Sequence, residues 1–273
     1  MSFSKKIMIG AVTAFLGIAV NASTAAVFFT FHKEYADRDR NANAQFNTGF
    51  NLSAGDGTVR NTKSAMTYFQ RAANAGNEMA QVYMAMDFES KNNLRQAAVR
   101  YKKAAAKDQE VALYKLGEFS EFGKGGEKQD WKKAAEYYKK SADKGYAPAQ
   151  YKYGVMCAMG KGVAQSWKEA AVWYKKAAQP AKDTYPPDAM AQCNLAWCYA
   201  KGLGVAQSWK EAAKWYLASA ESGVAEAQFQ LAECYAKGLG LQQNKDWAVY
   251  WYRQAASQDL KKAKEALKAY GLN

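Results

Sequence analysis

The hydrophobic and polar positions of this chain follow one pattern that recurs six times. Each copy has one or two aromatic residues, then a basic or polar pair, then two small residues, as in Tyr137–Ala142 and Trp173–Ala178. The last aromatic of each copy is Phe69, Tyr101, Tyr138, Tyr174, Tyr216 or Tyr252, at intervals of 32, 37, 36, 42 and 36 residues. Such intervals are typical of helix pairs that stack into a solenoid, where each unit buries its apolar face against its neighbours.

Each copy also carries a helix-start signal eight residues before this aromatic. The side chain there has an oxygen that can accept a hydrogen bond from a free backbone N–H of the first helical turn. These six residues are Asn61, Asn93, Asp130, Ser166, Ser208 and Asn244. Glu169 and Glu211 follow two of these caps by three residues, as in a capping box. The pattern therefore predicts where the second helix of each pair begins.

A first helix is predicted upstream of each cap. It begins near a small residue in every copy, namely Ala44, Ala80, Ala112, Ala149, Ala191 or Ala227. Four of these helices are followed by a Gly-x-Gly turn, which starts at Gly123, Gly160, Gly202 or Gly238 and permits positive φ where the chain reverses. The second copy has Ser90-Lys-Asn-Asn93 instead and lacks the glycine turn.

This order of residues resembles the Sel-one-like repeat, a relative of the tetratricopeptide repeat. The family pattern runs from Ala and Leu through Tyr, Gly-x-Gly-Val and a cap to Trp-Tyr, and residues 191–216 show it best. The resemblance implies an all-α, right-handed α/α solenoid of about six helix-pair repeats in an exported bacterial protein. We assign a lead-in to residues 23–43, the repeats to 44–260 and a C-terminal capping helix to 261–273.

The N-terminal segment has the features of an export signal. Lys5 and Lys6 precede an apolar run over residues 7–20, and Val20-Asn21-Ala22 offers short side chains at the positions that signal peptidase reads. We predict a signal peptide over residues 1–22 and repeats that are periplasmic or secreted. The alternative is an uncleaved inner-membrane anchor extending to residue 31, because the apolar stretch continues to about the length that a bilayer requires. In both cases the repeats lie across the cytoplasmic membrane.

Charge narrows the classes of partner. The formal net charge is +13, and removing Lys5 and Lys6 leaves +11. The pairs Lys102-Lys103, Lys139-Lys140 and Lys175-Lys176 occupy the same positions of successive second helices and predict a basic stripe. This stripe is either a solvated outer face or a surface that attracts acidic proteins or polysaccharide. Export, together with the lack of a recognition module, disfavours nucleic acid.

Candidate catalytic and metal-binding residues are few. The only histidine, His32, lies beside the apolar segment, so the repeats contain no histidine to act as a base or as a metal ligand. Ser141-Ala-Asp-Lys144 matches the nucleophile motif of penicillin-recognising enzymes, but the companion motifs are missing, and four of the other five copies have Ala in the Ser141 slot. We expect no catalytic residue, no cofactor and no metal. A β-lactam-binding or hydrolysing enzyme is the alternative function.

The four cysteines fall on predicted first helices. Cys157, Cys198 and Cys234 stand on stacked helices about 9 Å apart, which is outside the range of a disulfide. Cys193 points away from Cys198 on the same helix. We expect mostly buried thiols, and whether any of Cys157, Cys193, Cys198 and Cys234 form a disulfide stays open.

The resemblance also implies a binding surface. In tetratricopeptide-like stacks, the side of the first helices that faces away from the buried side lines a concave groove. It holds positions three, six and ten after each starting alanine, which are Lys115, Glu118, Phe122, Lys152, Val155, Met159, Asn194, Trp197, Lys201, Gln230, Glu233 and Lys237. Trp197 is the candidate anchor, since a large aromatic on an exposed face is typical of binding hot spots. The alternative is that flanking loops cover it.

A proline-rich insertion, Gln179–Asp188, separates the fourth and fifth copies and should project as a stiff loop, either neutral or in contact with a partner. We predict a monomeric, non-enzymatic scaffold of the bacterial envelope whose partner is a protein, such as an acidic segment or a secreted effector. Roles in envelope assembly, virulence and immunity against effectors are all open. The membrane is contacted only through the N-terminal segment, if that segment is not cleaved.

Overall fold

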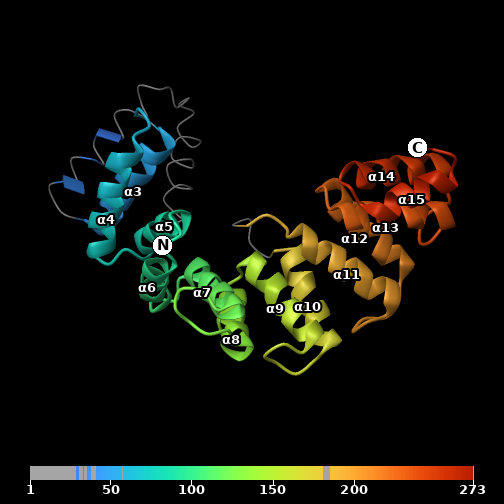
Figure 1. Cartoon of the computed structure of the whole chain (residues 1–273), viewed down its shortest axis with the longest axis horizontal. Helices are drawn as coiled ribbons and strands as arrows, with labels where there is room; N and C mark the ends of the chain where they lie inside the picture. Colours follow the sequence, from blue (N-terminus) through green and yellow to red (C-terminus); the bar gives the residue numbers. More distant parts are fainter. Residues whose placement is uncertain are drawn as a thin grey trace, which may run out of the picture. The chain divides into compact units, whose positions relative to one another are not determined.

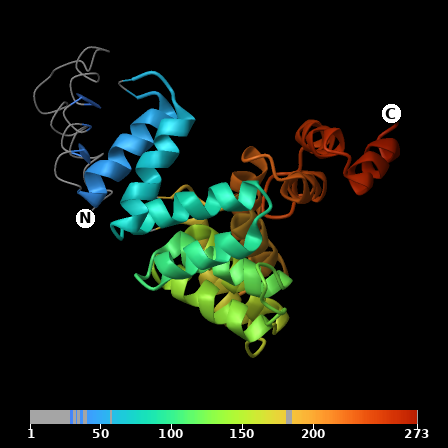
Figure 2. The same cartoon turned by 60° about the vertical axis from the view of Figure 1, so that its left-hand side comes forward.

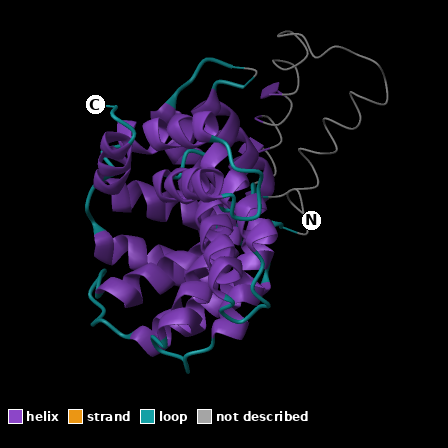
Figure 3. Ribbon diagram, turned by 90° about the vertical axis from the view of Figure 1, so that its right-hand side faces the viewer, coloured by secondary structure: helices purple, strands orange, loops and turns teal. Residues whose placement is uncertain are grey.

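The computed structural model describes residues 29, 30, 33, 36, 37, 41–56, 58–180 and 185–272. These residues form thirteen α helices and no strand (Figure 3). The helices are α3 (Ala42–Ala54), α4 (Thr62–Asn74), α5 (Glu78–Ser90), α6 (Leu94–Ala105), α7 (Glu110–Phe122), α8 (Trp131–Asp143), α9 (Ala147–Met159), α10 (Trp167–Ala178), α11 (Ala189–Lys201), α12 (Trp209–Glu221), α13 (Ala225–Lys237), α14 (Lys245–Ser257) and α15 (Lys261–Ala269).

The helices belong to two compact units. The first unit comprises the described residues up to Phe119 together with Gly123–Lys128, and the second comprises Ser120–Phe122 together with the described residues from Gln129 onward. In the first unit α3 pairs with α4 and α5 with α6 (Figures 1 and 2). In the second unit α9 pairs with α10, α11 with α12 and α13 with α14, while α15 packs on α14. The prediction of an all-α solenoid built from helix pairs is confirmed.

The second helices begin where the caps predict. Each of the six cap side chains accepts a hydrogen bond from the backbone N–H three residues later, at 2.9 to 3.3 Å. For Ser208, the donor is the backbone nitrogen of Glu211 at 3.3 Å. These bonds satisfy N–H groups that have no partner within the helix, so they fix the helix start.

The first helices begin two residues earlier than predicted. For example, α9 begins at Ala147 rather than Ala149, and α11 begins at Ala189 rather than Ala191. The reason for α11 is a further cap, which the sequence pattern does not reveal. Asp188 accepts a hydrogen bond from the backbone nitrogen of Ala191 at 2.8 Å, so the buried alanine is the third residue of the helix.

A close backbone approach joins successive repeats of the second unit. Gly204 has a φ of +73°, and a Cβ atom at this residue would lie 2.2 Å from the carbonyl oxygen of Trp167 at the start of α10. Gly162 and Gly240 approach the preceding second helix in the same way. The second glycine of the turn is therefore required by its conformation and also by the neighbouring backbone. The sequence pattern predicts only the first of these roles.

Aromatic rings and small side chains fill the interior. Tyr101, Tyr138, Tyr216 and Tyr252 are fully buried, as the recurring pattern predicts for the last aromatic of each copy. The rings of Trp173, Trp215 and Trp251 are also buried and belong to the core. All four cysteines are buried free thiols.

Several predictions fall on residues that the structure does not describe. These are residues 1–22 with the export signal, His32, and residues 181–184 of the proline-rich insertion. At the described end of the insertion, the ring of Tyr185 packs edge-on against Tyr146 with ring centres 4.9 Å apart. In the described part of the chain, no helix has the length and apolarity needed to cross a bilayer.

Candidate functional site

The candidate site is the side of the first helices that carries positions three, six and ten. In the second unit these helices are α9, α11 and α13, together with the last turn of α7. None of the predicted residues there is buried. Phe122, Met159 and Trp197 are 52%, 58% and 39% exposed, respectively. Exposed large apolar side chains are typical of protein-binding surfaces, although the binding role of this side stays a prediction.

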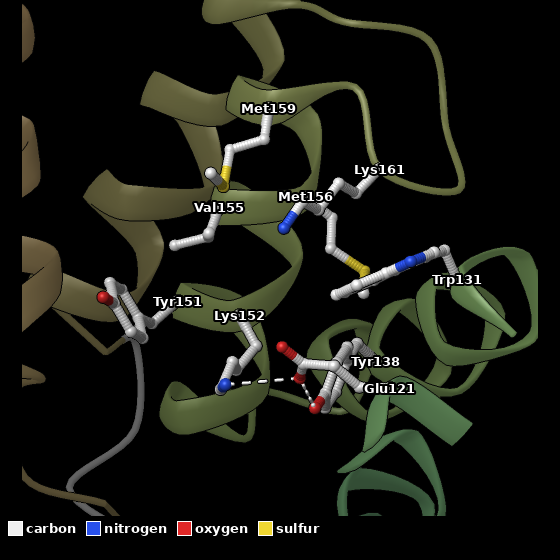
Figure 4. A pocket seen from close by; sticks show the side chains of 9 residues that line it. All are labelled: Glu121, Trp131, Tyr138, Tyr151, Lys152, Val155, Met156, Met159 and Lys161. Atoms are coloured by element: carbon white, nitrogen blue, oxygen red, sulfur yellow. Dashed lines mark hydrogen bonds and ion pairs between the residues drawn. The ribbon is translucent and has the colours of Figure 1, made fainter. Parts of the chain in front are cut away.

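A pocket of about 80 Å³ opens on this side of the second unit (Figure 4). Its lining residues are Glu121, Trp131, Tyr138, Tyr151, Lys152, Val155, Met156, Met159 and Lys161. Lys152, Val155 and Met159 are predicted from their positions on the first helix. Trp131 and Lys161 are not, because one starts a second helix and the other lies in a turn. An apolar wall with a cationic rim suits an apolar group that has a negative charge beside it.

The charge of Lys152 is used inside the protein. Its Nζ lies 3.3 Å from Oε2 of Glu121 and 5.6 Å from the ring centre of Phe122. The same glutamate oxygen accepts a hydrogen bond from the Tyr138 hydroxyl at 2.5 Å, as the dashed lines of Figure 4 show. Lys152 therefore ties α9 to the last turn of α7, and it is not a free cation for a ligand.

An equivalent bridge links α7 to α5 within the first unit. The Nζ of Lys115 lies 3.4 Å from Oε1 of Glu89 and 3.0 Å from Oε2 of Glu118, and the Tyr101 hydroxyl donates to Glu89 at 2.8 Å. Burial lowers the pKa of Lys115, but the hydrogen bonds and charges of Glu118 and Glu89 outweigh it, so its pKa is raised overall. Two of the predicted groove residues thus pair with each other.

The two bridges follow one sequence rule. In each, a Glu at position nine of a first helix pairs with a Lys at position three of the next first helix. Where position nine is Ala158 or Ala200, position three of the next helix is Asn194 or Gln230 instead of Lys. The chain places this lysine only where a carboxylate is available. The joint occurrence of the two residues, which is visible by aligning the copies, therefore marks both lysines as structural.

The other polar positions of the face also have internal partners. Asn194 hydrogen-bonds the hydroxyls of Tyr151 and Tyr174, and both tyrosines have a pKa raised chiefly by burial. Gln230 donates to Glu226 at 2.9 Å. These contacts engage the polar side chains of α11 and α13 within the stack.

At the C-terminal end of the face, Glu233 accepts a hydrogen bond from Tyr252 and pairs with Lys237. Burial raises the pKa of Glu233, but Lys237 and Tyr252 lower it by more, so the net shift is downward. By contrast, Lys201 is exposed and makes no hydrogen bond or ion pair within the described residues. It is the predicted cation that remains available to a ligand.

Trp197 is partly covered by another aromatic ring. Its ring centre lies 5.3 Å from that of Trp167, with 57° between the planes. The cover is thus the first residue of α10 rather than a flanking loop. More than a third of Trp197 stays accessible, which is sufficient for contact with a partner.

Several lysines of the predicted basic stripe also have partners within the protein. Lys139 and Lys176 place their Nζ atoms 5.7 and 3.8 Å from the ring centre of Trp173. In the first unit, Lys102 pairs with Glu127 at 2.7 Å. Lys139 and Lys176 therefore cover the buried ring of Trp173, and Lys102 neutralises a carboxylate. Lys140 and Lys175 are exposed members of the stripe in the second unit and cover no buried ring.

Groups suited to chemistry are scarce. No cluster of His, Cys, Asp or Glu in the described residues could hold a metal ion. Burial is the largest cause that raises the pKa of Cys193 to about 12 and that of Cys157, Cys198 and Cys234 to about 11. Such thiols stay protonated near neutral pH and are poor nucleophiles. Ser141 is also fully buried.

Comparison with known families identifies the repeat. A model of the Sel1 repeat matches residues 42–77, 111–146, 147–179, 189–224 and 225–260. The copy without a glycine turn lies outside these matches, although α5 and α6 pair there as the other repeats do. No curated protein matches the sequence.

Two solved structures are similar over most of the chain. A protective antigen present in uropathogenic Escherichia coli strains shares 28% identity with a TM-score of 0.75, and the match covers 90% of this chain and 50% of the antigen. A Sel1 repeat protein from Oxalobacter formigenes shares 25% identity with a TM-score of 0.70, and the match covers 88% of this chain and 68% of that protein. The chain thus spans about half the length of the antigen.

Proposed function

The chain belongs to the Sel1 repeat family, and from this premise we propose that it is a non-enzymatic scaffold that binds a protein partner through the first helices of its second unit. Stacked repeats offer extended surfaces on which neighbouring helices contribute side by side. The observation that carries the proposal is the set of exposed apolar side chains Phe122, Met159 and Trp197 on three successive first helices. Many of the other positions on this side hold polar residues with internal partners.

The chemistry of this face favours an acidic partner segment with an apolar anchor. Lys201 and Lys161 are exposed, and neither makes an ion pair within the described residues. Lys152, in contrast, is neutralised by Glu121. An acidic group would therefore be attracted by the two free lysines, while apolar contact with Trp197 and Met159 supplies most of the affinity.

The burial of the candidate nucleophiles in the described residues supports a non-enzymatic role. The four thiols and Ser141 are buried, and the repeats hold no histidine that could act as a general base. A β-lactam-binding enzyme would need Ser141 at an open site. Its full burial favours the interpretation of this serine as a small core residue.

We also propose that the protein is exported. The support is the sequence of residues 5–22, which combines two lysines, an apolar run and a peptidase-like site. Envelope assembly, virulence and immunity against effectors are the candidate roles of such an exported scaffold. The intact mass of periplasmic protein should correspond to a chain that begins at Ser23. A full-length species found only in membranes would indicate an anchor, and a cytoplasmic pool would contradict export.

The binding proposal is tested by comparing two variants with one affinity-purified partner. Trp197→Ala should weaken binding by roughly 2 kcal/mol or more, which is about a thirtyfold rise in Kd. The matched control changes Lys140 and Lys175 to Gln, since neither covers Trp173, and it should leave Kd nearly unchanged. Lys201→Glu should mainly slow association and weaken its salt dependence. If the stripe variant loses binding and Trp197→Ala keeps it, the first-helix face is not the binding surface.

A further inference from the structure

Two equivalent niches of the second unit, one beside Trp131 and one beside Trp167, differ in the side chain that faces them. Trp131 starts α8 as Trp167 starts α10, and Val155 has the place on α9 that Trp197 has on α11. On α11 the indole of Trp197 reaches Trp167, with ring centres 5.3 Å apart. On α9 the smaller Val155 leaves the pocket of about 80 Å³ beside Trp131 (Figure 4). One repeat therefore carries the occupant that the other repeat lacks.

We propose that the pocket beside Trp131 receives an aromatic side chain of the protein partner, in the way that the niche at Trp167 receives Trp197. This deepens the proposed protein-binding function and rests on it. The volume of about 80 Å³ is several times the roughly 10–15 Å³ that one water molecule requires, so the pocket has room for more than a single solvent molecule.

The walls of the pocket suit an aromatic ring. Figure 4 shows Trp131 and Met156 on one side of the space and Val155 and Met159 on the other. Thioether side chains adapt their shape and make favourable contacts with ring edges. An incoming ring would lie between the side formed by Trp131 and Met156 and the side formed by Val155 and Met159, and its contact with the Trp131 indole would match the one that Trp167 already provides for Trp197.

The charge at the rim of the pocket favours an acidic residue next to the aromatic residue of the partner. Lys161 lies with its Nζ 4.3 Å from the ring centre of Trp131, is exposed, and has no carboxylate partner within the described residues. Glu121 and Lys152 cancel each other, so the lining residues carry one net positive charge. When a ring enters over Trp131, Lys161 must swing aside, and a carboxylate next to the ring would then pair with it. The occupant is thus an aromatic residue followed or preceded by Asp or Glu.

The test uses two synthetic pentapeptides, Gly-Asp-Trp-Asp-Gly and the matched Gly-Asp-Leu-Asp-Gly. They are titrated into protein labelled with ¹³C at the methionine methyl groups, because Met156 and Met159 line the pocket. The tryptophan peptide should shift both methyl signals upfield through its ring current, and it should bind roughly two- to tenfold more tightly than the leucine peptide. Equal binding of the two peptides, or equal shifts at Met84 in the other unit, would overturn the proposal.

Val155→Trp fills the pocket from within, as Trp197 fills its neighbour. This variant should unfold at a temperature close to that of the unchanged protein and should bind the tryptophan peptide at least about tenfold more weakly. Lys161→Glu changes a surface residue and leaves the core untouched, so it serves as the second test variant if Val155→Trp folds poorly. It should weaken the binding of both acidic peptides. If Lys161→Glu or a folded Val155→Trp still binds the tryptophan peptide with unchanged affinity, the pocket is not the binding site of that peptide.

The two proposals can fail separately. A natural partner that depends on Trp197 but is indifferent to Val155→Trp would keep the scaffold function and overturn the pocket assignment. Specific binding of the tryptophan peptide that Val155→Trp abolishes supports the pocket, even where Trp197→Ala has no effect on the natural partner.

Discussion

Replacing Gly204 with Ala tests the backbone contact that joins successive repeats. The added methyl group would lie 2.2 Å from the carbonyl oxygen of Trp167 and 2.3 Å from its carbonyl carbon, and φ at this residue is +73°. A left-handed conformation costs an L-residue about 1–2 kcal/mol. Overpacking costs about 1–3 kcal/mol, and the upper end applies because the obstruction is the backbone of a helix start. We expect the free energy of unfolding to fall by about 3–5 kcal/mol.

Two other glycines separate these costs. Gly223 has a φ of +87° and no atom within 4 Å of an added Cβ. Gly223→Ala should therefore lower the free energy of unfolding only by the cost of the left-handed conformation, about 1–2 kcal/mol. Gly202, in the same turn as Gly204, would meet Gln207 Cβ at 3.3 Å and should fall between the two. Urea titrations followed by circular dichroism give the free energies, and hydrogen exchange locates the loss at α10 and α11. A Gly204→Ala protein no less stable than Gly223→Ala would refute the backbone contact.

Four further predictions concern other parts of the stack. Ser208→Ala removes the cap of α12 and should cost about 1 kcal/mol, with loss of hydrogen-exchange protection mainly in the fifth repeat; a uniform loss would contradict repeat-by-repeat stability. Lys152→Ala breaks a half-buried ion pair and should lower the free energy of unfolding by about 1 kcal/mol, whereas the exposed Lys201→Ala should leave it unchanged in the same urea titration. The four thiols have a raised pKa of about 11 to 12, so at pH 8 they should be labelled by iodoacetamide only after unfolding, and rapid labelling of native protein in mass spectra would contradict their burial. Purified protein should not turn over a chromogenic β-lactam, and Ser141→Ala should not alter this; saturable turnover lost in that variant would establish the enzyme alternative.

Much of the fold is predictable because its signals are local. The caps at Ser166 and Ser208 each act within one helix turn, and so does the recurring aromatic within its helix. Their structural roles can therefore be predicted from neighbouring residues in the sequence. The predicted start of α9 is two residues off because a first helix has weaker signals, and Tyr146 there makes no side-chain cap bond. Contacts between repeats cannot be predicted in this way. The contact between Gly204 and Trp167 depends on how one repeat packs on the next, and the sequence of a single copy does not show this.

The exposed side of the first helices is predictable from helical periodicity, but the contacts of its residues are not. The position rule selects Lys152 as exposed, whereas the structure pairs it with Glu121. The same rule omits Trp131 and Lys161, because it considers first helices and ignores the start of a second helix. Comparison of the copies recovers part of this information, since a Glu at position nine and a Lys at position three of the next helix occur together.

The repeated architecture explains how one residue can create a binding site without disturbing the fold. Positions that contact the next repeat, such as the buried tyrosines and the second turn glycine, recur in most copies because each of these copies meets a similar neighbour. Position six varies between copies, and it is Val155 in one repeat and Trp197 in the next. With Trp131 and Trp167 equivalent, the side chain at that position, Val155 or Trp197, decides whether an indole of the protein itself reaches the niche. Specificity can thus reside in one repeat while the stack around it keeps its packing.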